Sequence, residues 1–268
     1  MGCLPDSQMG TGPAASVAAE MGAMFPSLRF GLLVGVGGGV WSEDHDVRLG
    51  DVVVSRPDKD NNNGGVIQYD YGKAIQGGEF QETGILNLPP TILLSSLGKL
   101  RSTPAAKSQF FPYLKSFEAF DDDSPEFARR PTAKDRLFKP EFGHVKKEAT
   151  CRNCDAEHEI YREERLNARS KVHYGTIASG NQVMKDAEKR DTIAEGRGIL
   201  CFEMEAAGLM NQFPCLVVRG ICDYCDSHKN KAWQPYAAAA AAAWAKELLR
   251  NVSPGELRGE RTIQAQGL

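Results

Sequence analysis

The sequence predicts an α/β protein with a mainly parallel sheet covered by helices on both faces. Apolar segments of strand length alternate with helical segments along much of the chain. Residues 32–36 and 52–54 are apolar or glycine throughout, which is typical of strands covered on both sides. With 268 residues, the chain is long enough for one large domain of this class.

The first zone, residues 11–56, predicts a helix followed by two strands. Residues 11–25 are rich in alanine and form the helix candidate. Residues 27–40 predict a buried strand that runs into a glycine loop, because Gly37, Gly38 and Gly39 should break the strand. The second strand follows at residues 48–55.

The middle zone, residues 57–170, is less regular. Its elements are a turn at 61–65, a short strand at 66–74 and a helix at 91–102 that follows two prolines. Residues 121–170 are rich in charge and poor in apolar periodicity. This segment reads as a polar insertion in one domain rather than as a second core.

The last zone regains a strong pattern of alternating strands and helices. The predicted elements are a strand at 172–180, an amphipathic helix at 181–198, a strand at 199–205, a short helix at 206–213, a strand at 215–226 and an Ala-rich helix at 235–250. Residues 1–250 are therefore expected to form a single domain, and the polar residues 251–268 a disordered tail.

Composition excludes several classes of function. The net charge of −3 argues against nucleic-acid binding, since such proteins normally carry a basic excess. No apolar stretch reaches the length needed to span a membrane. Seven cysteines without a visible secretory signal are typical of reduced thiols in a cytoplasmic protein.

The glycine loop is the first candidate site. It lacks the dinucleotide fingerprint, because Val40 stands where the third glycine belongs, and no Walker loop is present elsewhere. Gly37 and Gly38 leave backbone that a ligand could approach closely. A tight turn at the end of the strand, without a ligand, explains these glycines equally well.

A pair of carboxylates lies in the segment CFEMEAAG. Alternation in a strand would place Glu203 and Glu205, which flank Met204, on the same side. Carboxylates so placed could accept hydrogen bonds from the vicinal hydroxyls of a sugar. Alternatively, one of them caps the helix that follows.

The segment RGICDYCDSHKN carries Asp223 at the carboxyl end of an apolar strand. A partly buried aspartate there could act as a general acid, or it could simply close the loop. Arg219 lies four residues earlier, on the same face, and could be a structural partner for one of the acids.

Two Cys-x-x-Cys units invite a zinc interpretation, but their settings differ. Cys151 and Cys154 lie in the polar insertion, whereas the unit at 222–225 begins within a buried strand. A shared site is therefore not expected. A local site made by Cys151 and Cys154 with His158, and with His144 as a further ligand, is an alternative to surface thiols. Surface thiols are favoured, so no metal is expected.

Taken together, the motifs resemble the nucleoside phosphorylase and nucleosidase superfamily. The order of VGVGGG, GDVVVS, GTIASG, EMEAAG and RGICDY carries the resemblance, which covers most of the chain from about residue 3 to residue 249. The sequence looks most similar to the fungal branch, whose domains often stand at the head of signalling proteins. The resemblance implies a three-layer α/β/α sandwich around a central mixed sheet.

The resemblance also implies cleavage of the N-glycosidic bond of a nucleoside. Glu205 would bind the ribose hydroxyls beside Met204, and Asp223 would protonate or hydrogen-bond a purine base. The remaining residues matched to the pocket are Glu203 beside the sugar, Gly37 and Gly38 at the sugar and nucleophile, and Val183 and Met184 at the base. No cofactor is implied, and phosphate would be needed only as a co-substrate of phosphorolysis, a glycosyl transfer.

Departures from the family pattern favour hydrolysis. Leu33 and Val36 stand where phosphorylases carry an Arg and a Ser that grip phosphate. Val183 stands where an aromatic often stacks on the base. The family's first strands, with the acid near the nucleophile, are expected to be absent. No residue can therefore be assigned as the base that activates water.

Three functions follow from these residues. The first is a purine nucleosidase that forms homo-oligomers and binds neither nucleic acid nor membrane. The second is a nucleoside-binding or signalling module without turnover, which the missing strands would explain. The third is a fragment with little function, whose unpaired sheet edge favours association.

Overall fold

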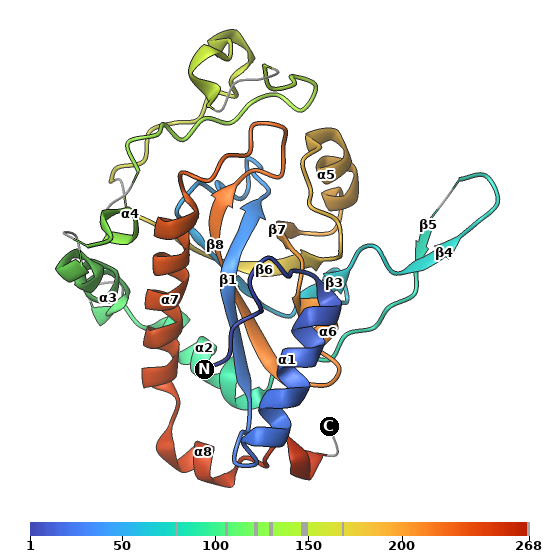
Figure 1. The fold of residues 1–268 in the computed structure, drawn as a ribbon, viewed down its shortest axis with the longest axis vertical. Helices are drawn as coiled ribbons and strands as arrows, with labels where there is room; N and C mark the ends of the chain where they lie inside the picture. The colour runs from blue at the N-terminus through green and yellow to red at the C-terminus, as the bar shows by residue number, and fades with distance from the viewer. Residues whose placement is uncertain are drawn as a thin grey trace.

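A six-stranded sheet forms the centre of the molecule (Figure 1). In the computed structural model, residues 1–78, 80–104, 107–120, 123–128, 131–145, 150–167 and 169–266 are described. The strands of the sheet are β1 (Gly31–Gly39), β2 (Val52–Ser55), β3 (Val66–Gln68), β6 (Val172–Ser179), β7 (Ile199–Glu203) and β8 (Cys215–Asp223). Their order is β2-β8-β1-β7-β6-β3. The strands β4 (Gly72–Ala74) and β5 (Phe80–Glu82) form a separate hairpin that projects from the sheet in Figure 1.

The sheet is mixed and mainly parallel, as predicted. β1 pairs with β8, and β6 pairs with β2, β3 and β7, in parallel, whereas β1–β7 and β2–β8 are antiparallel. Because β2 pairs with both β8 and β6, five of these strands close into a ring, with β3 attached outside it. The sequence did not predict this closure, since a strand's pattern of burial does not show which neighbours it has.

Helices cover the sheet on both sides. α7 (Gln234–Asn251) packs on β1 and β8, and its alanines let it approach closely. A Cβ added at Gly220 would lie 1.9 Å from the carbonyl oxygen of Ala237, so this contact requires glycine. α1 (Thr11–Met24) packs against α6 (Ala206–Leu209) on the other side in Figure 1. The other α-helices are α2 (Thr91–Ser102), α3 (Phe110–Lys115), α4 (Pro125–Ala128), α5 (Ala187–Ala194) and α8 (Pro254–Gly259).

The glycines of β1 continue the strand instead of breaking it, which corrects the predicted loop. Gly37 pairs with Ile221 and Gly38 with Asp223, with a register shift between the two pairs. A Cβ at Gly38 would lie 2.6 Å from Asp223 Oδ1 and 2.1 Å from the Cys225 sulfur. The absence of a side chain at Gly38 therefore lets the side chains of Asp223 and Cys225 pack directly against the backbone of β1.

The C-terminal segment is folded in the part that the structure describes, so the predicted disordered tail is corrected. α7 extends to Asn251, and α8 follows it. Ile263 is buried, and its N–H donates to the Leu28 carbonyl at 2.7 Å. This anchoring occurs because one apolar residue in a polar stretch finds a site on the core. Residues 267–268 lie outside the described residues.

The polar insertion has little regular structure among its described residues. It contains α4 and the 3₁₀ turns η3 (Cys151–Asn153) and η4 (Ala156–His158), and the 3₁₀ turn η2 (Ser116–Phe120) precedes it; residues 121, 122, 129, 130, 146–149 and 168 lie outside the description. Below, "the insertion" means residues 131–145 and 150–167. It forms the loops beyond the carboxyl ends of β1 and β8 at the top of Figure 1. The predicted helix 181–198 is also shorter, since only α5 forms there.

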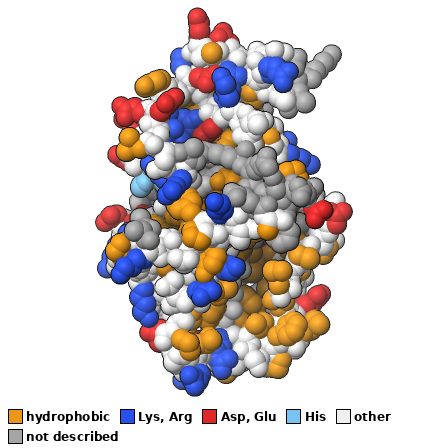
Figure 2. Space-filling view, turned by 90° about the vertical axis from the view of Figure 1, so that its left-hand side faces the viewer, with side chains coloured by type: hydrophobic (Ala, Val, Ile, Leu, Met, Phe, Trp, Pro, Cys, Tyr) orange, Lys and Arg blue, Asp and Glu red, His pale blue; other side chains and the backbone are white. Residues whose placement is uncertain are grey.

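Side-chain chemistry differs between the two ends of the molecule. Figure 2 shows charged side chains over the upper part of one face and apolar side chains gathered over its lower part. None of the helices formed by the described residues combines the length and apolar character that a bilayer crossing needs.

Candidate functional site

All the residues predicted for the site line one cavity of about 1080 Å³. β1, β7 and β8 contribute to its wall, together with the loop after β6 and the N-terminal segment. The predicted residues that meet there are Gly37, Gly38, Val183, Met184, Glu203, Met204, Glu205 and Asp223. Strand ends of a mainly parallel sheet thus gather these groups, as such sheets do for their ligands.

Glu203 is a buried helix cap. Its carboxylate accepts hydrogen bonds from the N–H groups of Glu205 and Ala206, at 3.1 Å each, at the start of α6. It also forms an ion pair with Arg219. Because its oxygens are occupied, the structure favours the capping interpretation for this carboxylate.

Glu205 is the more accessible of the two carboxylates. One of its oxygens lies 3.2 Å from Arg219 Nη2, and the other accepts the Gly10 N–H at 3.3 Å. β7 ends at Glu203, so Glu205 lies outside the strand that was predicted to hold both. Arg219 brings the two carboxylates together instead.

Arg219 is the cation that Glu203 and Glu205 share. Burial lowers the pKa of its guanidinium, but Glu203 and Glu205 raise it by more, so the net shift is upward. Its Nε is buried and has no hydrogen-bond partner among the described residues. The sequence interpretation of Arg219 as a structural partner of the acids is consistent with these contacts.

Asp223 lies at the end of β8 with its carboxylate already engaged. It accepts the Cys225 N–H at 3.0 Å and forms an ion pair with Lys229 Nζ at 2.9 Å. Burial lowers the pKa of Lys229, but Asp223 raises it by more, and the net shift is upward. Lys229 was not predicted, because five residues of irregular loop separate it from its partner.

The loop after β6 supplies an apolar border. Met184 is buried against the cluster that contains Phe202 and Tyr69, whereas Val183 is 45% exposed. The rings of Tyr69 and Phe202 meet edge to face at 5.3 Å. Val183 therefore offers a small apolar surface at the cavity and no ring for stacking.

The two Cys-x-x-Cys units are separate, as predicted. Cys222 and Cys225 are buried in the cavity wall beside Asp223. Cys151 and Cys154 lie in the insertion, and Cys154 is buried, so the expectation of surface thiols is corrected for it. His144 lies beside this second pair, and His158 instead stacks on Phe142 with ring centroids 4.2 Å apart.

A second cavity, of about 820 Å³, adjoins the first. It is lined by residues of the insertion and by the loop after β8, and the two cavities share Cys222, Asp223 and Lys231. The insertion therefore reaches the back of the candidate site.

Comparison with solved structures places this geometry in a known fold. The 5′-methylthioadenosine/S-adenosylhomocysteine nucleosidase from Neisseria meningitidis, in complex with methylthio-immucillin-A, aligns with a TM-score of 0.53 and 16% identity over 91% of this chain and 78% of that one. Futalosine hydrolase of Helicobacter pylori gives 0.52 and 16% over 91% and 77%. The nucleosidase from S. pneumoniae with a transition-state inhibitor gives 0.52 and 15% over 92% and 78%.

These likenesses show that the chain has the fold of the nucleoside phosphorylase and nucleosidase superfamily. At such identities they establish the fold and leave the activity open. A curated nucleotide-binding leucine-rich repeat (NLR)-like protein of Hyaloscypha variabilis is 46% identical over 261 residues, 97% of this chain. This relative agrees with the fungal branch of the resemblance. The chain spans 25% of that protein's length. No model of a protein family matches the chain.

Proposed function

We propose that this chain hydrolyses the N-glycosidic bond of a purine nucleoside. The observation that carries the proposal is the meeting of Asp223, Glu205 and the β1 glycines at one cavity in a nucleosidase fold. Solved proteins of this fold are named as nucleosidases and hydrolases. Hydrolysis is favoured over phosphorolysis because Leu33 and Val36 offer no charge-assisted contacts to phosphate.

The charges of the site suit a transition state with positive charge on the sugar. Three carboxylates, Glu203, Glu205 and Asp223, face two cations, Arg219 and Lys229, in direct ion pairs. This set of five carries one net negative charge, which would stabilise an oxocarbenium-like ribose.

Each group has a place in the mechanism. Glu205 would accept hydrogen bonds from the ribose hydroxyls, exchanging its contact with the Gly10 N–H for them. Asp223 would take up a proton on substrate binding and pass it to the departing purine nitrogen, so that it is a carboxylate again, paired with Lys229, when the ribose carries positive charge. Gly38 has no side chain, so the sugar can approach the backbone of β1 beside Asp223.

The deciding assay measures free base released from adenosine, inosine and guanosine, with and without phosphate. We expect release without phosphate, and a loss of about 10²–10⁴-fold in kcat for Asp223→Asn. Glu205→Gln should mainly raise KM. Lys99→Ala removes an exposed ion pair with Glu256, far in sequence from the site, and is the matched control. Folded protein that releases no base under any condition would refute catalysis.

A second candidate is a nucleoside-binding module without turnover. Two observations favour it: the backbone of Gly10 already occupies Glu205, and the relative is an NLR-like protein of which this chain covers 25%. Calorimetry separates the two functions, because a binding module gives heat with a nucleoside and no product. Binding that is unchanged in Glu205→Gln would contradict the pocket assignment in both cases. Homo-oligomer formation and a cytoplasmic location stay predictions.

A further inference from the structure

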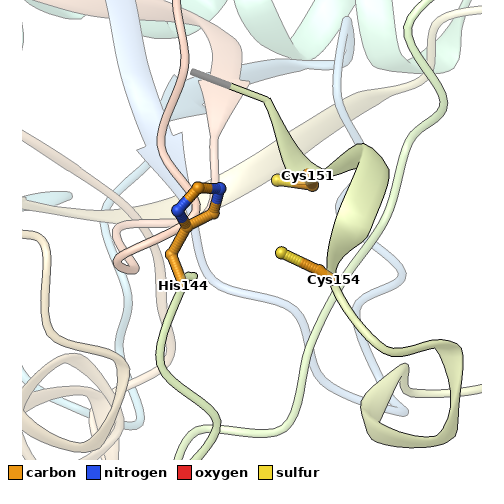
Figure 3. A group of neighbouring side chains, drawn as sticks. All are labelled: His144, Cys151 and Cys154. Atoms are coloured by element: carbon orange, nitrogen blue, oxygen red, sulfur yellow. The ribbon is translucent and has the colours of Figure 1, made fainter. Parts of the chain in front are cut away.

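A side-chain cluster outside the candidate site has the composition of a metal centre. His144, Cys151 and Cys154 each offer a ligand atom, and these atoms lie within 4.8 Å of one another. Figure 3 shows the imidazole of His144 and the two thiols turned toward a common space. In a tetrahedral zinc site, ligand atoms about 2.0–2.3 Å from the ion lie about 3.3–3.8 Å from each other. Small side-chain rotations would close this cluster to that size.

A candidate for a fourth ligand lies next to the cluster. His228 is buried, and neither of its ring nitrogens has a hydrogen-bond partner among the described residues. Its ring meets that of His144 edge to face, with centroids 5.3 Å apart. The Cys151 thiol lies 3.6 Å from the His228 carbonyl oxygen, so the two loops are already in contact. Its Nδ1 lies 3.7 Å from Asp226 Oδ2, which is too far for a hydrogen bond. A buried imidazole that makes no hydrogen bond is rare and requires an explanation, which a bound cation supplies.

We propose that His144, Cys151, Cys154 and His228 bind one zinc ion. Two thiolates and two imidazoles in tetrahedral geometry are a donor set that zinc prefers, and hard cations such as magnesium prefer oxygen. Cys151 and Cys154 release their protons when the metal binds, so binding is coupled to pH.

The surroundings support the ligands. Arg136 Nη1 and Nη2 donate to the carbonyls of Cys151 and Cys154, which fixes the turn that presents both thiols. Glu159 pairs with the same guanidinium at 2.5 Å. The ring of His228 stacks on Phe138 with centroids 4.0 Å apart, which sets its plane. Contacts of this kind orient metal ligands in proteins.

The position of the zinc ion gives it a role. Its first three ligands come from the insertion, and His228 comes from the loop after β8, which begins directly after Asp223 and carries Lys229. The ion would therefore fasten the insertion to the segment that holds Asp223. It would be structural, since all four positions are filled by protein and none is left for water.

Metal content of the purified full-length chain tests the proposal. We expect one zinc per chain, and its loss in the double variant Cys151→Ser/Cys154→Ser. Cys3→Ser, which changes an exposed cysteine, should retain the metal. Cobalt added to the metal-free chain should give thiolate-to-cobalt charge transfer and the strong visible bands of a tetrahedral site. Folded wild-type chain without these bands, or equal metal content in the double variant, overturns the site.

The fourth ligand is tested separately with His228→Ala. Contacts outside the ligand shell contribute about 10–100-fold to affinity, so loss of a ligand should weaken cobalt binding by at least about 100-fold. His45→Ala, at an exposed histidine, is the control and should bind as the wild type does. Unchanged affinity in His228→Ala refutes this ligand. A disulfide between Cys151 and Cys154 in freshly reduced and repurified protein would refute the zinc site. Neither result depends on nucleosidase activity.

Discussion

The strand ends line the candidate site and the insertion lines the cavity that adjoins it, and the two regions are held in different ways. At the strand ends, Gly37, Gly38 and Asp223 are placed by the ladder between β1 and β8. In the described part of the insertion, one isolated bridge, Phe138 to Glu159, is the β pairing. Backbone pairing holds the strand ends in place. The insertion has little backbone pairing among its described residues, so its side chains must hold it.

Arginines do much of this work in the insertion. Arg136 binds the carbonyls of Cys151 and Cys154, and Arg162 binds Asp135 and the Tyr224 hydroxyl. Each planar guanidinium can join several backbone and carboxylate oxygens at once. We therefore expect a substitution in the sheet to destabilise the whole domain, and a substitution in the insertion to loosen the insertion alone.

The largest effect is expected for Arg219→Met, which breaks the buried ion pair at the strand ends. The change leaves Glu203 charged, buried and without its cation. Loss of one partner of a buried pair costs about 3–5 kcal/mol of unfolding free energy. Denaturant unfolding at pH 7 measures it, and the transition should stay single because the whole sheet is affected.

A double variant gives the control for this prediction. Glu203→Gln removes the charge and retains an acceptor for the N–H groups that open α6. Arg219→Met/Glu203→Gln should therefore be more stable than Arg219→Met alone. If the two variants unfold at the same denaturant concentration, the uncompensated charge is not the cause.

The next effect is expected at Asp51, where the two regions meet. This carboxylate, at the start of β2, accepts two hydrogen bonds from Arg165 of the insertion, at 2.8 and 2.7 Å, and contacts His173 of β6 at 2.9 Å. Asp51→Asn keeps the shape and removes the charge. We expect a loss of about 1.5–3 kcal/mol, typical of hydrogen bonds to charged groups, measured by denaturant unfolding.

The pH dependence of Asp51 has a definite sign. Burial raises the pKa of Asp51, but hydrogen bonds from His173 and Arg165 lower it by more, so it lies below the ordinary value of 3.8. The unfolded state therefore takes up a proton first as the pH falls. The ionised Asp51 contributes its full stabilisation at pH values above the pKa that it has in the unfolded chain. This contribution is lost as the pH falls to the lower pKa that Asp51 has in the folded protein. The stability gap between wild type and Asp51→Asn should narrow below about pH 4. A gap that widens there would contradict the assignment.

The same division explains what the sequence could predict. The strands around residues 52–54 and 215–223, and the helix at 91–102, follow from apolar patterning and capping residues, and the structure has them. The convergence of Glu205, Asp223 and the β1 glycines could be predicted because strand ends of one sheet lie together. The continuation of β1 through its glycines could not be predicted, since it depends on side chains from the end of β8 that pack against these glycines.

Side-chain contacts between residues of irregular loops could not be predicted from the sequence. Lys229 reaches Asp223, and His144 rather than His158 joins the two thiols, because of loop paths that no period of two or 3.6 residues encodes. A buried histidine whose ring nitrogens make no hydrogen bond among the described residues, such as His228, is also a property of the folded surroundings alone. Charged residues in the insertion looked like a solvated surface, whereas three of its arginines are partly buried and form ion pairs.

The smallest effect on the unfolding free energy of the domain is expected for Arg162→Met, in the insertion. Arg162 Nη2 lies 3.2 Å from Asp135 Oδ1, and its Nη1 donates to the Tyr224 hydroxyl at 2.6 Å. Tyr224 retains its hydrogen bond to Asp135 at 2.6 Å after the change, so no buried hydroxyl is left unpaired. The cost in unfolding free energy should be about 1 kcal/mol.

Hydrogen exchange shows whether this damage stays local. In Arg162→Met, the amides of Lys139 and Ile160, which close the insertion on itself, should exchange faster. Amides between β6 and β7 should keep their wild-type rates, since the ladder there does not involve Arg162. Arg258→Met, at an arginine whose Nε donates to the Pro254 carbonyl within its own helix α8, should leave both sets unchanged. Equal acceleration in the sheet and the insertion would mean that the two regions open together, and that the arginines support the whole domain rather than the insertion.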